Sequence, residues 1–472
     1  MTAEAATTAR PPLGLTHPHF TAASSFSLAL LVALFCLPPL HASVRALARP
    51  AVTRRVRSGL TVVSWLQARR TPGLTALFSA ASATVSVPFY VAALPALQWC
   101  GSPALGARLS FALGVALYVG NALKDLVCAP RPLGLVAGSC EGGERRPARS
   151  SPRRPRRSAS APALHASSPV ITSASSGPAG AAAEAVSARE YGLPSSHVMN
   201  TLVLAAYAAH YGLGHTAVGR GWVARTPVAA PLLAYGGAGL ATAVVALARM
   251  YAGMHTPVDV LAGAAAGVAV FSAWTAFDEP HEAFLVAPGT TGVAVLATHA
   301  LTSALLLRLH PRPLVHTPSY EASATFLGAC TGVAGGVWRS RGQHLVSGGW
   351  ASLPHARGAG AVAAAVALRL ACGFGTAALV HVAAKATART CVPFAYRAVP
   401  LALRRLWQPP LHSLMTDRKW TALRIPLDAR GRPWDVSITT RFLSYAALGW
   451  GVSDGAFGVM GWAERRWWLT QP

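Results

Sequence analysis

Charged side chains are scarce in this chain of 472 residues. They make up 12% of the sequence, against about 25% in ordinary soluble domains. Acidic residues are the scarcest: Asp and Glu total 16 against 41 Lys and Arg, which leaves a formal net charge of +25. The shortage of charge argues against a single water-soluble globule. The basic surplus points to nucleic acid or anionic lipid as a partner.

Spacings typical of metal sites, disulfide scaffolds and repeats are also missing. The seven cysteines are scattered, with no CxxC pair and no His/Cys metal spacing. This distribution argues against a zinc site or a disulfide scaffold. The sequence contains no internal repeat, which argues against the transporters that are built from inverted repeats.

Apolar runs fill much of the chain. Hydrophobic residues make up 52% of it, and many are small, as helix contacts inside a bilayer prefer. This composition favours lipid over nucleic acid. We predict an all-α, multi-pass integral membrane protein with about eight to ten transmembrane helices. The candidate spans are Leu74–Leu97, Leu105–Leu123, Val198–Leu213, Val228–Leu247, Val258–Phe277, Thr291–Leu307, Ala324–Val337, Val362–Val382 and Phe442–Trp462.

Two segments fall outside this pattern. Phe26–Leu37 is a short apolar run with only Arg10 as a basic residue before it, so a retained segment is favoured over a cleaved signal peptide. Residues 133–188 combine Ser, Pro, Ala and Gly with a cluster of arginines, which predicts a disordered insertion in an extramembrane loop. The predicted domains are an N-terminal segment (1–73), a catalytic core in two parts (74–132 and 189–277) and a C-terminal transmembrane region (278–472).

Three short clusters place ionisable residues at the ends of apolar spans, where burying a charge is costly. They run from Lys124 to Pro132, from Glu190 to His197 and from Arg249 to Asp259. Counting the spans along the chain brings all three clusters to one face of the membrane. This convergence predicts a shared site.

The residue types in the clusters suit phosphoryl transfer. Lys124, Arg131 and Arg249 supply positively charged donors for a tetrahedral oxyanion. Ser195 adds a hydroxyl at the start of a helix, whose amides can point at the same anion.

Two histidines complete the requirement for this chemistry. One of His197 and His255 can attack phosphorus while the other protonates the leaving alcohol. Asp259, four residues after His255, can hold the imidazole about one helical turn away. The scheme needs no metal ligands and no cofactor.

The clusters resemble the signature of the type 2 phosphatidic acid phosphatase (PAP2) superfamily of lipid phosphatases. That signature reads Lys-x6-Arg-Pro, Pro-Ser-Gly-His and Ser-Arg-x5-His-x3-Asp. Here Ser196 replaces the Gly and Ala248 replaces the first Ser of the last motif. All three clusters and the segment from His316 to Glu321 are similar to the sphingosine-1-phosphate and long-chain-base phosphate phosphatase branch.

The resemblance implies a phosphohistidine mechanism in a multi-pass protein of the endoplasmic reticulum membrane. His255 would be the nucleophile, Asp259 its orienting partner and His197 the general acid and base. The substrate would be a membrane lipid, a sphingoid long-chain-base 1-phosphate, and no nucleic acid is implied. The phosphate-binding residues would be Lys124, Arg131, Ser195, Ser196 and Arg249.

Three alternatives remain open at this point. A phosphatidate or isoprenoid-diphosphate phosphatase would use the same residues. A polytopic transporter would use the intramembrane charges for a permeation path. A non-catalytic relative is disfavoured by the complete set of His197, His255 and Asp259.

The orientation in the membrane is also open. Seven arginines from Arg45 to Arg70 predict a cytosolic location under the positive-inside rule. If Leu74–Leu97 is the next span, the count then places the three clusters in the cytosol, whereas the resemblance implies a luminal site. Arg220 and Arg225, in a loop between later spans, argue for the opposite orientation.

Overall fold

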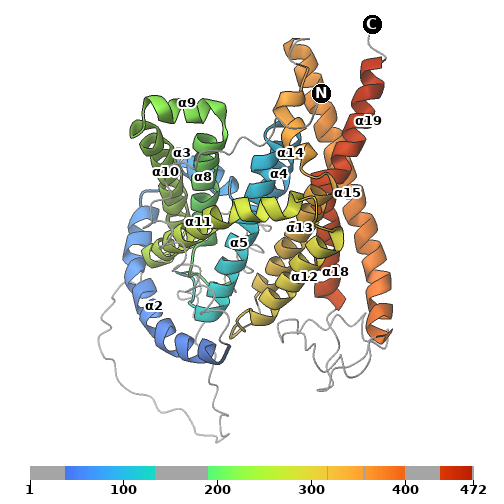
Figure 1. The fold of residues 1–472 in the computed structure, drawn as a ribbon. Helices are drawn as coiled ribbons and strands as arrows, with labels where there is room; N and C mark the ends of the chain where they lie inside the picture. The colour runs from blue at the N-terminus through green and yellow to red at the C-terminus, as the bar shows by residue number, and fades with distance from the viewer. Residues whose placement is uncertain (1–37, 133–189, 316, 355–357, 399–435, 470–472) are drawn as a thin grey trace, which may run out of the picture.

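The computed structural model describes residues 38–132, 190–315, 317–354, 358–398 and 436–469 (Figure 1). The short apolar run Phe26–Leu37 and the predicted insertion 133–188 therefore lie outside the described residues. Secondary structure in the described residues is helical, apart from one isolated bridge between Pro130 and Tyr191.

The helices follow the predicted apolar runs closely. Their first half comprises α2 (Pro38–Gln67), α3 (Pro72–Ala83), α4 (Val87–Cys100), α5 (Pro103–Val127), α8 (Ser196–His215), α9 (Ala217–Arg225) and α10 (Ala229–Tyr251). The second half comprises α11 (Pro257–Val286), α12 (Gly292–Leu309), α13 (Ser319–Arg339), the short α14 (Gln343–Ser347) and η1 (Gly349–Ser352), α15 (Ala359–Ala398), α18 (Val436–Trp450), the π-helical η3 (Gly451–Gly455) and α19 (Ala456–Leu469).

Local sequence signals explain where several helices begin. Thr71, Ser86 and Ser102 each precede a helix, and their side chains accept a backbone N–H from the first turn. Proline follows each of them within the first two helical positions, where its missing N–H costs nothing. The helix starts are therefore encoded locally.

Two predicted spans are not continuous helices. The run Leu74–Leu97 is divided into α3 and α4, which are bent by 58° where Ser86 starts the second helix. The run Phe442–Trp462 passes through the π-helical turn η3 between α18 and α19. Both breaks are short and contain polar residues, such as Ser86 and Asp454, but each lies inside a longer apolar run, so hydropathy averaged over a span detects neither.

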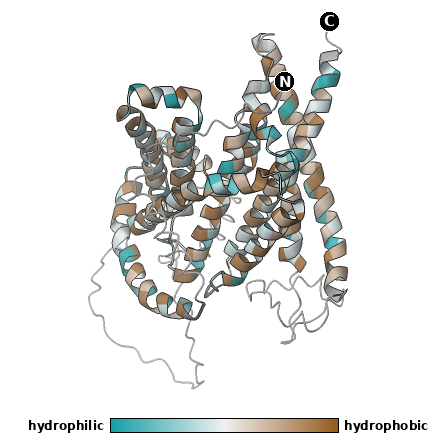
Figure 2. Cartoon of the chain, in the orientation of Figure 1, coloured by the Kyte–Doolittle hydropathy of each residue, from teal (hydrophilic) through white to brown (hydrophobic). Residues whose placement is uncertain are grey.

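The long helices have the length and composition of membrane spans. Five of them, α5, α10, α11, α12 and α15, are long and apolar enough to cross a bilayer, and the bent α3–α4 pair makes a sixth if it is counted as one span. Large apolar side chains such as Leu240, Leu301 and Leu379 are about two-thirds exposed on these helices. Lipid is the environment that such surfaces suit. Figure 2 shows hydrophobic residues along these helices.

The helices α8 and α13 occupy a different position from the spans that face lipid. They fall outside that set although the predicted eight to ten spans included both. α8 packs against α5, α10 and α11, and α13 packs against α5, α12 and α18. Because other helices cover them, their surfaces tolerate small and polar residues such as Ser323 and Thr331.

The arrangement of the helices brings specific ends together. The C-terminal end of α5, the starts of α8 and α11 and the end of α12 lie in the lower half of Figure 1. α2 curves along the same side of the molecule and contacts α5, α10 and α11. On the other side of the bundle, α13, α15 and α18 pack together.

Glycines allow the closest helix contact, between α13 and α18. A Cβ at Gly332 would lie 1.8 Å from the Ala446 carbonyl oxygen, and one at Gly449 would lie 2.2 Å from the Ala329 oxygen. Both neighbours are backbone atoms that a rotamer change cannot move. The helix spacing is thus fixed by the absence of side chains.

We predict that Gly332→Ala destabilises the protein by about 1–3 kcal/mol, because α13 and α18 must separate to admit the methyl group. Thermal unfolding of the protein in neutral detergent measures the effect. Gly237→Ala in α10 is the matched control, since a Cβ there meets nothing within 4 Å. Equal melting temperatures for the two variants would contradict the packing argument.

Candidate active site

Two hydrogen bonds join the three clusters at one end of the bundle. Lys124 Nζ, near the end of α5, donates to Ser196 Oγ at the start of α8 at 3.0 Å. The Ser195 N–H donates to the carbonyl oxygen of Asp259, in the first turn of α11, at 3.0 Å. The clusters therefore lie on one face, as the count of spans predicts.

The close approach of α11 to Ser195 requires a glycine. A Cβ at Gly263 would lie 2.6 Å from the Ser195 carbonyl oxygen. The Ser195 side chain is completely buried, and its Oγ forms no hydrogen bond to a described residue. The hydroxyl is therefore a buried donor that a bound anion would satisfy.

A short backbone clamp positions Arg131. Cys128 ends α5 in the left-handed conformation, with φ of 54°. The chain then pairs with the second cluster, as the Gly192 N–H donates to Ala129 O at 2.9 Å. Arg131 follows directly, buried, and its guanidinium forms an ion pair with Glu190. The first two clusters thus form one folded unit around this arginine.

The turn from α10 to α11 positions the third cluster. The Met254 N–H donates to Arg249 O at 3.1 Å, and Gly253 adopts a positive φ of 74° that a side chain would disfavour. Arg249 Nε is buried without a hydrogen-bond partner among the described residues. This guanidinium is a second buried donor in the site.

Asp259 caps the helix that follows His255. Its Oδ2 accepts hydrogen bonds from the Thr256 N–H at 2.7 Å and from the Thr256 hydroxyl at 2.8 Å. The same oxygen lies 3.9 Å from His255 Nδ1, which is beyond hydrogen-bond distance. The carboxylate is therefore adjacent to the imidazole but is held by the first turn of α11.

His255 has the properties of a neutral nucleophile. Its side chain is 1% exposed, and neither ring nitrogen forms a hydrogen bond to a described residue. Burial, together with the nearby charges of Arg131 and Arg249, holds the pKa of His255 well below its usual value. A neutral imidazole keeps a lone pair for attack on phosphorus.

His197 lies in the same field of positive charge. The charges of Arg249, Lys124 and Arg131 act on it, in that order of strength, and it interacts electrostatically with His255. All eight residues singled out from the sequence thus occupy one region. Among the residues that the structure describes, no three His, Cys, Asp or Glu side chains form a group that could hold a metal ion.

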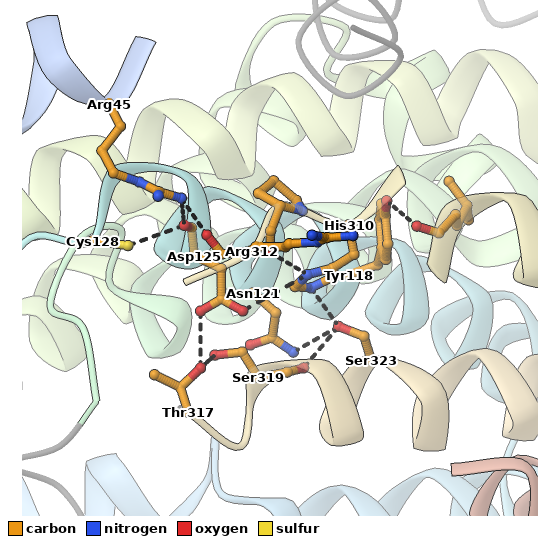
Figure 3. Close-up of polar contacts among 12 residues, drawn as sticks. Arg45, Tyr118, Asn121, Asp125, Cys128, His310, Arg312, Thr317, Ser319 and Ser323 are labelled. Atoms are coloured by element: carbon orange, nitrogen blue, oxygen red, sulfur yellow. Dashed lines mark hydrogen bonds and ion pairs between the residues drawn. The ribbon is translucent and has the colours of Figure 1, made fainter. Parts of the chain in front are cut away.

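A buried polar network connects the end of α5 to residues of the C-terminal half (Figure 3). None of its residues is among the candidate site residues predicted from the sequence. Asp125, the neighbour of Lys124, is completely buried. Its Oδ1 accepts a hydrogen bond from Thr317 Oγ1 at 2.9 Å, and its Oδ2 lies 3.7 Å from His310 Nδ1. The sequence signal for this network was the family resemblance of the segment from His316 to Glu321.

The helix α2 closes the same end of the bundle. Gly59 packs against Thr256, with a Cβ position 2.9 Å from Thr256 Cβ. Arg70 donates to Tyr251 O at 3.1 Å, and Arg45 donates to the carbonyl oxygens of Asp125 and Leu126. The sequence shows that this stretch is basic but gives no sign that it packs against the site.

These observations define the chain as a multi-pass helical membrane protein with a buried, cation-lined site at one end of the bundle. Comparison with known proteins gives the same answer: residues 105–281 match the PAP2 superfamily, so the chain carries a PAP2 superfamily domain. This match confirms the resemblance noted in the motifs. The matched range runs from α5 to α11 and includes all eight candidate residues.

Curated relatives extend the similarity beyond that domain. A "Lipid phosphate phosphatase delta" of Arabidopsis thaliana is 29% identical over 87% of this chain and 88% of the relative. A dihydrosphingosine 1-phosphate phosphatase of Saccharomyces cerevisiae is 25% identical over 60% of this chain and 58% of the relative. The human "Sphingosine-1-phosphate phosphatase 2" is 27% identical over 59% and 55%. No solved structure gives a significant match.

We predict that Thr317→Val lowers both stability and turnover. The variant leaves a buried carboxylate oxygen of Asp125 without its hydroxyl donor, at a cost of about 1–3 kcal/mol, and it loosens the α5 end that carries Lys124. Melting temperature and kcat in detergent measure the two effects. Thr331→Val is the control, because that hydroxyl bonds Leu327 O within its own helix. A Thr317 variant indistinguishable from this control would refute the supporting role.

Proposed function

We propose that the chain is a lipid phosphatase that hydrolyses sphingoid long-chain-base 1-phosphates through a covalent phosphohistidine. The observation that carries the proposal is the buried His255. Its ring nitrogens form no hydrogen bond to a described residue, and Arg131, Arg249 and Lys124 act on it electrostatically. A nucleophile held beside cations suits a phosphate monoester.

In the first step, a nitrogen of His255 attacks phosphorus and the bond from phosphorus to the lipid oxygen breaks. Nε2 is the attacking atom, because Nδ1 faces Asp259 at 3.9 Å. The electron pair of the broken bond stays on the lipid oxygen, which takes a proton from His197 and leaves as an alcohol.

In the second step, water attacks the phosphohistidine. His197, now neutral, accepts a proton from the water as the new oxygen–phosphorus bond forms. The nitrogen–phosphorus bond breaks, which returns His255 to its starting state and releases inorganic phosphate. Lys124, Arg131 and Arg249 hold the phosphoryl oxygens in both steps, with the Ser195 and Ser196 hydroxyls as further partners.

The substrate class rests on the relatives and the motifs together. Several relatives are named for dihydrosphingosine or sphingosine 1-phosphate, whereas the relative that covers most of the chain is named only for lipid phosphates. Phosphatidate is therefore the second candidate substrate. By the same resemblance, we propose the endoplasmic reticulum membrane as the location.

We predict that His255→Ala abolishes phosphate release while the protein still inserts in the membrane, because no other nucleophile replaces the imidazole. Purified protein is assayed with dihydrosphingosine 1-phosphate and with phosphatidate in the same neutral vesicles. The wild type should show the higher kcat/KM for the sphingoid substrate. A preference for phosphatidate would move the assignment to the second candidate, and activity that survives the substitution would overturn the mechanism.

The comparison variant His197→Ala separates the two histidines. This variant should lose less activity on p-nitrophenyl phosphate than on the lipid, because p-nitrophenolate leaves without a proton donor. His255→Ala should lose both activities. Equal losses on the two esters in His197→Ala would remove His197 from the role of general acid.

We also predict that the acidic limb of the kcat/KM profile lies below about pH 6.5, the ordinary imidazole value. The lowered pKa of His255 keeps the imidazole neutral as the pH falls, so activity persists until the pH reaches that lowered value. The profile is measured with two esters whose phosphate pKa values differ. The comparison shows whether the acidic limb reports an ionisation of the enzyme or of the substrate. A limb that follows the ester, or one at the ordinary value, would contradict the assignment.

A further inference from the structure

The arginines of α2 line a surface groove that the proposed reaction does not use. A cavity of about 710 Å³ is bounded by Arg45, Arg49, Arg54 and Arg57 on one wall and by Pro130 and Leu314 on the other. A second cavity of about 330 Å³ shares Ala42 and Arg45 with the first and adds Arg308 and Arg312. We call the two cavities together the basic groove.

The charge of the basic groove is of one sign. Six arginines line it, and no carboxylate is among the described residues that bound either cavity. Guanidinium groups pair with phosphate oxygens in a forked geometry, so this lining fits a phosphate group. The groove is also concave, because Pro130 and Leu314 come from segments other than α2. A basic helix lying on a flat membrane surface would have no such second wall.

The position of α2 indicates where the phosphate comes from. Leu47 is 80% exposed and Trp65 is 54% exposed, on a helix that also carries the arginines. Exposed apolar and basic residues together suit the headgroup region of a bilayer. Anionic phospholipids present their phosphate groups at that depth. A lipid is therefore the expected occupant of the groove.

The basic groove is adjacent to the catalytic machinery but separate from it. Pro130, in its wall, directly precedes Arg131, and Arg45 and Arg49 donate to the carbonyl oxygens at the end of α5. Figure 3 shows Arg45 reaching this helix end. None of the arginines that line the groove belongs to the three clusters of the active site.

We propose that the basic groove binds the phosphate group of an anionic membrane phospholipid, at a site distinct from the one that holds the substrate. This lipid would occupy the groove between α2 and the segment around Pro130 and Leu314. It is not consumed, so the site anchors the catalytic end of the protein to anionic regions of the membrane.

The test measures binding of dihexanoyl phosphatidylglycerol, a phosphodiester lipid, to the purified full chain in neutral detergent. Arg54→Gln/Arg57→Gln removes two charges from the groove. Arg55→Gln/Arg69→Gln removes two charges outside the groove, one from α2 and one from the turn that follows it. The groove variant should bind about thirtyfold more weakly, because each of the two basic residues contributes roughly 1 kcal/mol near a membrane surface, and the control should bind like the wild type.

Further ligands identify the chemical group that binds, and a conservative variant controls for misfolding. Dihexanoyl phosphatidylcholine should bind weakly, and inorganic phosphate should compete poorly; strong competition would identify free phosphate as the occupant and overturn the lipid assignment. Arg54→Lys/Arg57→Lys should keep most of the affinity and the wild-type melting temperature. Equal losses in the two Gln variants, or no loss in either, would refute the groove. Binding is read without turnover, so the result is independent of the proposed function.

Discussion

The crowding of three cations at one end of an apolar bundle is the constraint on which the rest of the structure depends. Lys124 and Arg131 are each 6% exposed, and Arg249 is half-buried beside them. Like charges several ångströms apart repel by roughly 2–4 kcal/mol at an effective dielectric constant near 20. Glu190 offsets part of this repulsion through its ion pair with Arg131. A phosphate dianion would offset the rest, so the energy that destabilises the empty site favours substrate binding.

Such a site needs a scaffold that prevents the cations from moving apart. The backbone bond between Gly192 and Ala129 fixes Arg131, and the capping of α11 by Asp259 fixes the turn that carries His255. The network of Asp125, Thr317 and His310 adds support from α12 and α13, which lie beyond the matched domain. The C-terminal half therefore supports the candidate site rather than serving as a membrane anchor alone.

The sequence predicted the helices well, because they depend on local patterns, and the eight candidate site residues that it singled out lie together in the structure. Runs such as Val198–Leu213 and Val258–Phe277 correspond to α8 and α11. It predicted neither the bend between α3 and α4 nor the π-helical turn in the last run, since both breaks are short interruptions inside longer apolar runs. It also missed the partnership of Asp125 with Thr317, because contacts between residues 192 positions apart leave no periodic signal. The sequence also did not predict that α2 packs against the site, because that contact depends on tertiary packing.

The packing of α2 changes the argument about orientation in the membrane. Because Arg45 in α2 touches the end of α5 and Arg70, just after α2, touches Tyr251, these arginines and the candidate site share one face. These arginines therefore cannot be cytosolic if the site is luminal. The positive-inside rule counts Lys and Arg in short loops near the ends of membrane spans. Here Arg45 and Arg49 cap the otherwise unsatisfied carbonyl groups of a helix end. Their presence is explained by the fold, which weakens them as evidence for the compartment.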